Sequence, residues 1–378
     1  MADNNENKVL NVPHLRFPEF TEEWEETTLG KISEITKGSG ISKDQLSEQG
    51  SPCILYGELY TKYKSEIIDE VYSRTELDSS SLVKSKANDV IIPCSGETAI
   101  DISTARCVPF NNILLGGDLN IIRLKHDDGG FFAYQLNGAR KKDIARVAQG
   151  VSVVHLYGEN LKHIRVYHPA IEEQKKITRL LSLIDERIAT QNKIIEKLQS
   201  LIKGLAAQLT QSGTPNIRLC DCLECHSSTL LENCVSVTGS YPVYGATGLI
   251  GYTNNYAYNG ESILIVKDGS GVGSLSYVND HFSVIGTLNY LTAKENYSIL
   301  YLYYALMAFN FTPYITGMAI PHIYFKDYGK AKLFYPSIEK RIRIASLLHN
   351  IEQKLVVEQN LVISLSTQKS YLLRMLFI

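Results

Sequence analysis

An internal repeat is the feature of this sequence that most constrains its fold. Aligned with itself at an offset of 167 residues, the chain stays in register without a gap for about sixty positions. The identical pairs include Gly150/Gly317, His155/His322, Tyr157/Tyr324, Pro169/Pro336, Ile177/Ile344, Leu181/Leu348 and Leu209/Leu376. Self-similarity of this kind indicates a tandem duplication, so the chain should fold as two similar halves.

Each half ends in a segment with a heptad pattern. The apolar seam is formed in the first half by Ile177, Leu181, Ile184, Ile188, Ile195 and Leu198, and in the second by Ile344, Leu348, Ile351, Leu355, Val362 and Leu365. Spacings of four and three predict a helix that buries one stripe against a partner helix. Pro169 and Pro336 stand just before these helices, where proline is tolerated.

Gln191 and Glu358 occupy the same slot of the seam in the two halves. A polar residue in a seam can fix the register of the helices at some cost in stability. Alternatively, the seam drifts to the surface at this point. The sequence does not separate the two interpretations.

The connection between the halves is short. Six residues, 211–216, separate the first helix from the second globular region, and they span at most about 20 Å. A helix of roughly 40 residues spans about 60 Å. We therefore expect two similar α+β heads separated by two long helices that pack as an antiparallel coiled coil. The expected divisions are an N-terminal arm (1–20), head 1 (21–169), a helix (170–212), head 2 (213–336) and a second helix (337–378).

Short β-type runs followed by turn residues characterise both heads. The predicted strands are 89–92 and 119–124 in head 1, and 262–266 and 282–285 in head 2. Helices are expected over 131–146 and 299–309. These patterns predict an α+β head whose strands form a curved sheet or partial barrel.

Composition points to a globular chain with 44% hydrophobic and 21% charged residues. No apolar run approaches the roughly 18 residues of a membrane span. The acidic, polar start and seven cysteines lead us to expect a reduced, cytoplasmic protein without a membrane partner. The net charge of −2 is not that of a typical nucleic-acid binder. Local basic stripes exist at Arg140, Lys141, Lys142 and Arg146, and at Lys162, His163 and Arg165, although such stripes are also common on solvated faces.

Several motifs resemble the specificity subunits of type I restriction–modification systems. The stretches 241–248 (YPVYGATG) and 267–273 (KDGSGVG) resemble their target-recognition domains, and 169–177 (PAIEEQKKI) resembles the junction before their helices. The copy at 336–341 lacks the glutamine of that junction. The resemblance implies that each head reads half of a split site in double-stranded DNA, with the helices as spacer. It also implies docking of two modification (methyltransferase) subunits and of restriction/translocase subunits. No cofactor is expected in this chain; S-adenosylmethionine, ATP and Mg²⁺ are expected on those partners.

Candidate DNA contacts lie where the two heads differ, because identical positions cannot read different half-sites. They are Lys37, Ser39, Lys43, Tyr56, Lys62, Lys64, Ser95, Thr98, Arg140 and Lys141 in head 1, and Tyr241, Tyr244, Thr247, Lys267, Ser270 and Thr316 in head 2. Polar loop residues supply hydrogen bonds to base edges, and lysine and arginine contact phosphates. The identical glycine, histidine and tyrosine pairs are interpreted as scaffold or phosphate contacts, with core packing as the alternative for the tyrosines.

Other functions have weaker support. The sequence has no Pro-Pro pair of the kind an amino-methyltransferase needs and no GxxxxGK[ST] phosphate loop, so we expect a non-catalytic subunit. Cys220, Cys222, Cys225, His226 and Cys234 are crowded enough to suggest zinc. However, aligning Leu219 with Leu29 places Cys222 and Cys225 on the apolar positions Ile32 and Ile35, which favours buried thiols and no metal. A coiled-coil adaptor that bridges proteins without DNA is the rival function, and the mild acidity favours it.

Overall fold

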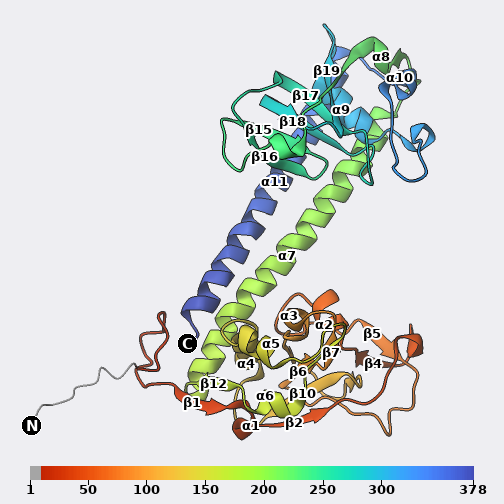
Figure 1. Cartoon of the computed structure of the whole chain (residues 1–378). Helices are drawn as coiled ribbons and strands as arrows, with labels where there is room; N and C mark the ends of the chain where they lie inside the picture. The colour runs from red at the N-terminus through yellow and green to blue at the C-terminus, as the bar shows by residue number, and fades with distance from the viewer. Residues whose placement is uncertain (1–9) are drawn as a thin grey trace, which may run out of the picture. The chain divides into compact units, whose positions relative to one another are not determined.

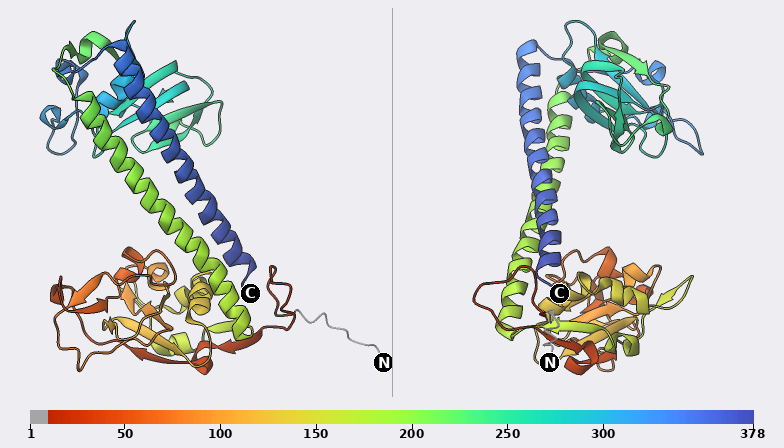
Figure 2. Two further views of the ribbon diagram at one scale, coloured as in Figure 1. Left: turned by 180° about the vertical axis from the view of Figure 1, so that it is seen from behind. Right: turned by 60° about the vertical axis from the view of Figure 1, so that its left-hand side comes forward.

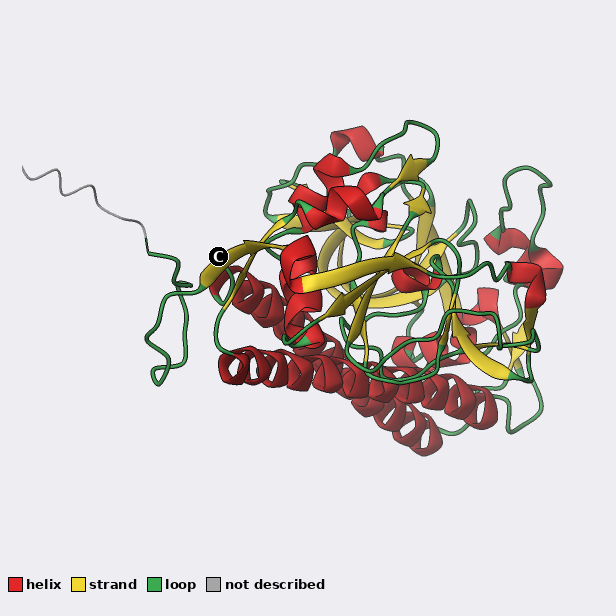
Figure 3. Cartoon of the chain, turned by 90° about the horizontal axis from the view of Figure 1, so that it is seen from below, coloured by secondary structure: helices red, strands yellow, loops and turns green. Residues whose placement is uncertain are grey.

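The computed structural model describes residues 10–378, which fall into two compact units. Unit 1 comprises the described residues up to Gln191 together with Leu361–Ile378, and unit 2 comprises Asn192–Asn360. Each unit contains one head and parts of two long helices, α7 (Ile171–Thr210) and α11 (Ile338–Met375) (Figure 1). Helices and strands are mixed in both heads (Figure 3). The predicted α+β class with two repeated heads and two long helices is confirmed.

Head 1 is built on a four-stranded antiparallel sheet in the order β2-β10-β6-β8. Its strands are β2 (Ser33–Lys37), β10 (Leu119–Leu124), β6 (Asp89–Pro93) and β8 (Arg106–Val108). The central strand β6 is buried on both faces, which explains its continuous run of valine and isoleucine. The predicted strands 89–92 and 119–124 are confirmed.

Smaller elements complete head 1. A second sheet has the order β3-β5-β4-β9, with β3 (Leu46–Ser47), β5 (Ser73–Thr75), β4 (Ser51–Ile54) and β9 (Leu114–Leu115). Two further strand pairs are β1 (Glu25–Thr28) with β12 (Arg165–His168), and β7 (Ser95–Gly96) with β11 (Val154–His155). The short helices are α1 (Leu29–Ile32), α2 (Glu58–Thr61), α3 (Ala99–Ile102) and α6 (Gly158–Lys162).

The helix expected over 131–146 is two helices, so this prediction was wrong in detail. Helix α4 (Gly129–Asn137) ends at Gly138, and α5 (Lys141–Val147) begins three residues later. Glycine is a poor helix former, and the chain leaves the helix at Gly138, whose N–H still donates to the Tyr134 carbonyl at 2.9 Å.

Head 2 has a six-stranded sheet in the order β14-β19-β17-β18-β15-β16. Its strands are β14 (Leu223–Ser227), β19 (Leu288–Ala293), β17 (Tyr258–Val266), β18 (Leu275–Val284), β15 (Tyr241–Gly245) and β16 (Gly248–Thr253). A further pair is β13 (Ile217–Arg218) with β20 (Lys332–Leu333), and the helices are α8 (Leu219–Cys222), α9 (Ile299–Met307) and α10 (Phe325–Tyr328). The predicted strands 262–266 and 282–285 are the C-terminal parts of β17 and, to within one residue, of β18, and the helix predicted over 299–309 is α9.

The ends of the heptad seam are buried in the core of each unit. In unit 1, Ile177 and Leu181 of α7 share a buried core with Leu372 and Leu376 of α11. In unit 2, the end of α7 and the start of α11 share a core that includes Ile202, Ala206, Ile344 and Leu348. The start of one helix therefore lies against the end of the other, as in an antiparallel pair. In the shared polar slot, Gln191 is buried, so the seam does not reach the surface there, and Glu358 is half-buried.

A tyrosine from each head binds a carboxylate on the long helix of the same half. In unit 1 the Tyr134 hydroxyl donates a hydrogen bond to Asp185 at 2.7 Å. In unit 2 the Tyr304 hydroxyl donates to Glu352, also at 2.7 Å. Asp185 and Glu352 are 167 residues apart, and each tyrosine stands six residues after the N-cap of its helix, Asp128 for α4 and Ser298 for α9, so the two contacts are equivalent. They attach each head to its own helix.

The junctions before the long helices are also equivalent. The Gln174 amide donates to the Pro169 carbonyl at 2.9 Å. Arg341, which replaces the glutamine in the second copy, donates to the Pro336 carbonyl at 2.6 Å. The substitution noted in the sequence therefore preserves the contact that closes the turn.

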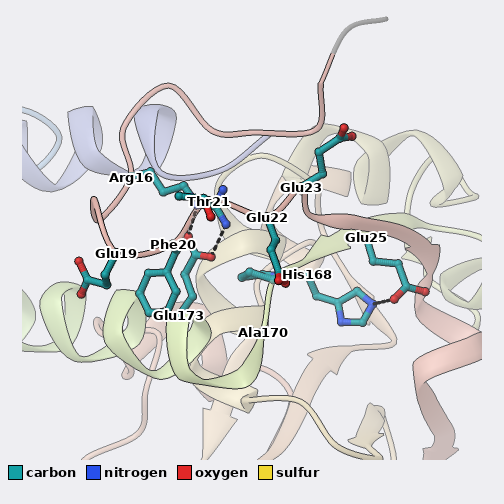
Figure 4. A pocket seen from close by; sticks show the side chains of 11 residues that line it. Arg16, Glu19, Phe20, Thr21, Glu22, Glu23, Glu25, His168, Ala170 and Glu173 are labelled. Atoms are coloured by element: carbon teal, nitrogen blue, oxygen red, sulfur yellow. Dashed lines mark hydrogen bonds and ion pairs between the residues drawn. The ribbon is translucent and has the colours of Figure 1, made fainter.

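Of the N-terminal arm expected over 1–20, residues 1–9 lie outside the described residues, and residues 10–20 contact the beginning of α7 and the end of α11. Arg16 makes a bidentate pair with the buried Glu173 at 2.8 and 2.7 Å, and Figure 4 shows the two bonded side chains in the lining of a pocket. The Leu15 N–H donates to the Met375 carbonyl at 2.8 Å. Trp24 packs edge-on against Phe377. The C-terminus therefore lies beside the arm (Figure 2). No helix within residues 10–378 has the length and apolar character needed to cross a membrane.

Candidate nucleic-acid interface

Both heads bring the same two loops together. In head 1, the turn after β6 leads into β7, which pairs with β11 through Ser95 and His155. The Leu156 N–H donates to the Cys94 carbonyl at 2.8 Å. In head 2, the turn after β17 pairs in the same way with the segment that contains His322, through an antiparallel bridge between Asp268 and His322. There the Ile323 N–H donates to the Lys267 carbonyl at 2.9 Å.

The second loop of each pair is a tight hairpin, residues 149–155 in head 1 and 316–322 in head 2. Its ends exchange two backbone hydrogen bonds, at 2.9 and 2.7 Å between Gln149 and His155 and at 2.9 and 2.8 Å between Thr316 and His322. We call the turn and the hairpin together the loop pair of each head. Because the connections are the same in both heads, the loop pair is part of the duplicated fold.

The identical glycines are scaffold residues of these hairpins, as one interpretation of the repeat predicted. Gly150 has φ of +119° and Gly317 has φ of +90°, conformations that side chains rarely adopt. A Cβ atom at these positions would approach a carbonyl oxygen of the same hairpin to 2.1 and 2.3 Å. Only glycine therefore permits this turn.

The identical tyrosines are not core residues, so that interpretation was wrong. Tyr157 is 45% and Tyr324 is 47% exposed. Each ring lies near the histidine of its own hairpin, with centroids 6.3 Å apart for His155 and Tyr157 and 5.0 Å apart for His322 and Tyr324. They border the loop pair and are free to contact a ligand.

Five of the candidate contacts lie on the loop pairs. Ser95 and Thr98 belong to the turn in head 1, and Lys267, Ser270 and Thr316 belong to the loop pair in head 2. The Thr98 hydroxyl caps α3 by accepting the Asp101 N–H at 3.1 Å. Ser270 and Thr316 are exposed, and Lys267 is half-buried. The structure therefore gathers candidates that are far apart in the sequence of head 2.

A second cluster in head 1 lines a pocket of about 940 Å³. Lys43, Tyr56 and Lys62 contribute to its wall. Lys62 is already paired with Glu58 at 2.6 Å and bonded to Ser73 at 2.9 Å. Ser39 lies nearby along the chain, but its hydroxyl accepts the Val83 N–H at 2.8 Å and so supports the fold. Lys37 and Lys64 are exposed.

Tyr241, Tyr244 and Thr247 form a separate group on β15 and the turn that follows it. The ring of Tyr241 packs against Tyr256 at 4.9 Å and His281 at 5.6 Å. Tyr244 packs edge-on against Phe282 and is half-buried. Thr247 is exposed at the tip of the turn. Thr247 is the exposed member of this group, whereas Tyr241 and Tyr244 are both half-buried.

Arg140 and Lys141 have structural roles in unit 1. Arg140 pairs with Asp143 at 3.2 Å, bonds the carbonyl of Ile378 and stacks over Tyr167 at 5.2 Å. Lys141 is half-buried, and this burial lowers its pKa. The basic stripe read from the sequence is therefore partly used to hold the C-terminal residues in place.

The crowded cysteines do not assemble a ligand set. Cys222 is fully buried, as the alignment with Ile32 predicted, and burial raises its pKa to about 12. Cys225 is half-buried, and burial raises its pKa to about 11. Among residues 10–378, no three His, Cys, Asp or Glu side chains are grouped so that they could hold a metal ion.

Sequence reasoning named none of the four apolar residues at the hairpin tips as individual contacts. Val151, Val153, Met318 and Ile320 are exposed at the hairpin tips, at 97%, 53%, 106% and 65%. The repeat contained a signal for them, because both members of each pair are apolar at an offset of 167 beside a shared glycine.

Comparison with known proteins shows the family to which the chain belongs. The model of the type I restriction modification DNA specificity domain matches residues 21–200 and again 217–365. The chain belongs to the type I restriction–modification DNA specificity family. The two matches correspond to the two copies of the repeat.

Individual members of the specificity family are distant relatives. The EcoprrI specificity subunit of Escherichia coli is 28% identical over 112 residues, which are 30% of this chain and 28% of that protein. The MjaVIII specificity subunit of Methanocaldococcus jannaschii is 25% identical over 203 residues, 53% of this chain and 44% of that protein. The matched segments thus span less than half of these curated relatives.

Solved structures share the fold of the whole chain. The type I S subunit from M. genitalium has a TM-score of 0.72 at 18% identity, covering 97% of this chain and 99% of that chain. A chain from a study of complex assembly and conformational transition of the type I restriction–modification system has a TM-score of 0.53 at 14% identity, covering 93% of this chain and 96% of its own.

Proposed function

We propose that this chain is a non-catalytic, sequence-specific DNA-binding subunit of a type I restriction–modification complex. Each head reads one half of a bipartite site in double-stranded DNA, and the long helices set the distance between the halves and dock the modification subunits. The observation that carries the proposal is the loop pair, which has the same connections in both heads but different side chains. Cys94 and Ser95 in head 1 occupy the places of Lys267 and Asp268 in head 2.

The chemistry of the loop pair suits DNA. Hydroxyl and ammonium groups on exposed turns can reach base edges and phosphates. Phosphate contacts act locally, so a chain of net charge −2 needs only a few cations at the interface. Lys37 and Lys64 are exposed in head 1, and Lys326 is exposed beside the Tyr324 ring in head 2.

The reactions themselves belong to partner subunits in this proposal. Two modification subunits bind S-adenosylmethionine and methylate adenine, and restriction/translocase subunits use ATP and Mg²⁺. This chain determines which DNA sequence is modified. Positions that differ between the heads should therefore alter the sequence that is modified without altering the chemistry.

The test is the adenine methylation pattern of cells that express this chain with its modification subunit. The variant Lys267→Ala/Ser270→Ala should relax or lose one half of a split motif, because each good base contact is worth about 1–3 kcal/mol of discrimination. Ser95→Ala/Thr98→Ala should affect the other half. Lys330→Ala, an exposed change in head 2 outside the loop pair, is the matched control and should leave the motif intact.

Two results would contradict the proposal. If a stable complex forms but methylates no defined sequence, the chain bridges proteins without reading DNA. If both double variants change the same half of the motif, the heads do not read separate half-sites.

A further inference from the structure

The hairpin tips of the two loop pairs expose apolar side chains that the proposed function has not yet used. Val151 and Val153 project from head 1, and Met318 and Ile320 project from head 2. Val151 and Met318 are almost completely exposed, at 97% and 106%. Side chains in this state add nothing to the core, and burial in a complex would stabilise that complex.

The repeat indicates that this exposure is a property of the loop. Met318 follows Val151 by 167 residues, and Ile320 follows Val153 by the same interval. The side chain changes in both pairs, but it stays apolar although a polar residue would be equally compatible with an exposed loop. The shape and apolar character of the tip are therefore shared, while its detailed chemistry is not.

The backbone of the hairpin is shaped by contacts at its base. Its ends are closed by two backbone hydrogen bonds, and Gly150 or Gly317 occupies the left-handed region at its start. Next to it, the turn of the loop pair is bonded to the hairpin, in head 2 also through the Gly269 N–H and the Pro321 carbonyl at 2.9 Å. A backbone shaped in advance of binding loses less conformational freedom when it enters a partner.

The size of the tip favours DNA over a protein as its occupant. A stable protein–protein interface buries about 800 Å² on each partner, far more than two side chains provide. Apolar wedges of one or two residues are sufficient to enter between stacked base pairs from the minor groove. Polar groups surround the wedge, with Ser95 in head 1 and Ser270 and Thr316 in head 2.

We propose that each hairpin is an apolar wedge that partly unstacks one base step of its half-site and bends the DNA there. This inference rests on the proposed function and adds a second mode of recognition to it. The wedge would favour flexible pyrimidine–purine steps, because these are the easiest to unstack. Each half-site would then contain a base step that is selected by deformability as well as by hydrogen bonds.

The experiment uses the complex of the full chain with its modification subunit, and a duplex that carries the motif read from the methylation pattern. The duplex has 2-aminopurine at successive steps to report unstacking and a dye pair at its ends to report bending. Wild-type complex should raise the fluorescence at one step in each half-site and shorten the distance between the ends.

The variants are Met318→Ser/Ile320→Ser in head 2 and Val151→Ser/Val153→Ser in head 1. Each should abolish the signal in its own half-site only, and should weaken binding by about tenfold for each side chain that is buried in the complex. Val237→Ser is the matched control, because Val237 is an apolar residue of head 2 that is 92% exposed outside the hairpin. It should leave both signals unchanged.

The possible failures are distinguishable. If wild-type complex shows no preference for the motif, the proposed function fails and the wedge fails with it. If binding is specific but the hairpin variants unstack and bend the DNA like the wild type, only the wedge is overturned. If the variants instead lose the modification subunit while their DNA signals persist, the tips are protein contacts and the wedge is likewise overturned.

Discussion

Lys369 occupies a seam slot of α11 that holds Ile202 at the equivalent place in α7. Its ammonium group lies 2.6 Å from Asp185 and 2.5 Å from Glu66, and all three side chains are at most 13% exposed. Buried charges are costly unless they are paired. The lysine therefore neutralises two carboxylates that the fold has already removed from water.

Replacing Lys369 by methionine should destabilise unit 1 by about 3–5 kcal/mol, because it leaves buried carboxylates without their cation. Chemical denaturation followed by circular dichroism would measure the change. Lys354→Met, an exposed change on the same helix, should alter the free energy of unfolding by less than about 0.5 kcal/mol. Equal effects of the two substitutions would show that the buried cluster is not needed.

His168 gives the same unit a dependence on pH. Its ring lies 3.0 Å from Asp127, and the hydrogen bond to this carboxylate raises the pKa of His168 despite the opposing effect of burial. Burial also opposes ionisation of Asp127, but hydrogen bonds from His168 and Gln174 keep its pKa below the usual value. The protonated ring is thus favoured by folding.

The stabilisation from protonated His168 should be complete below the unfolded-state pKa of about 6.5 and should be lost as the pH rises through the raised folded-state pKa. The difference in unfolding free energy between wild type and His168→Gln should therefore be largest near pH 5.5 and shrink toward pH 8.5. Urea titrations at several pH values would show this. His14→Gln, which replaces an exposed histidine, is the matched control.

At the scale of single elements, α7 contains one residue that weakens it. Gly204 lies inside the helix, and a Cβ at this position would meet no atom within 4 Å. By contrast, a Cβ on Gly130 in α4 would lie 2.5 Å from the Thr178 side chain. Close packing therefore requires the second glycine but not the first.

Gly204→Ala should raise the stability of unit 2 by about 0.5–1 kcal/mol, since alanine loses less conformational freedom in a helix. A higher melting temperature in calorimetry would confirm it. Gly130→Ala should lower the melting temperature of unit 1 because Thr178 must move. An unchanged or lower value for Gly204→Ala would mean that the helix is constrained there by contacts made in the complex.

Long periodic elements could be predicted from the sequence, whereas short ones could not. The seam defined α7 and α11 to within three residues, because a heptad pattern repeats many times. The break at Gly138 was missed because a single glycine is a weak signal within a helical pattern. The loop pair was also missed, since it depends on pairing between residues such as Ser95 and His155 that lie far apart in the sequence.

For the candidate contacts, sequence reasoning found the polar residues but not their surroundings. It grouped Arg140 with DNA contacts because charge is visible in a sequence, while its partners Asp143 and Ile378 are not. It named Thr316 but not Met318 as a contact, because an apolar residue is normally assigned to a core. Exposure, which decides both cases, appears only when the chain is folded.

At the scale of the whole molecule, the proposed spacer role predicts a change in the recognised site. Inserting one heptad in α7 after residue 195 and one in α11 after residue 355 adds seven residues at 1.5 Å each, or about 10 Å. Because DNA rises about 3.4 Å per base pair, the unread spacer of the methylated motif should lengthen by about three base pairs.

Both halves of that motif should stay the same, and methylome sequencing would read the result directly. An insertion in one helix only is the control, and it should abolish methylation because the seams fall out of register. An unchanged spacer with two insertions would show that the helices do not set the distance.

The duplicated tyrosine–carboxylate contact has a consequence for how such genes can diverge. Tyr134 and Asp185 lie in the first half of the chain, and Tyr304 and Glu352 lie in the second. Genetic recombination between the halves can therefore exchange a head together with its anchor and install a new specificity in one event. Lys369 restricts this exchange, because an incoming second half must bring a cation for Asp185 and Glu66 of the resident first half. Among viable recombinants, that slot should be inherited more strictly than any residue of the loops.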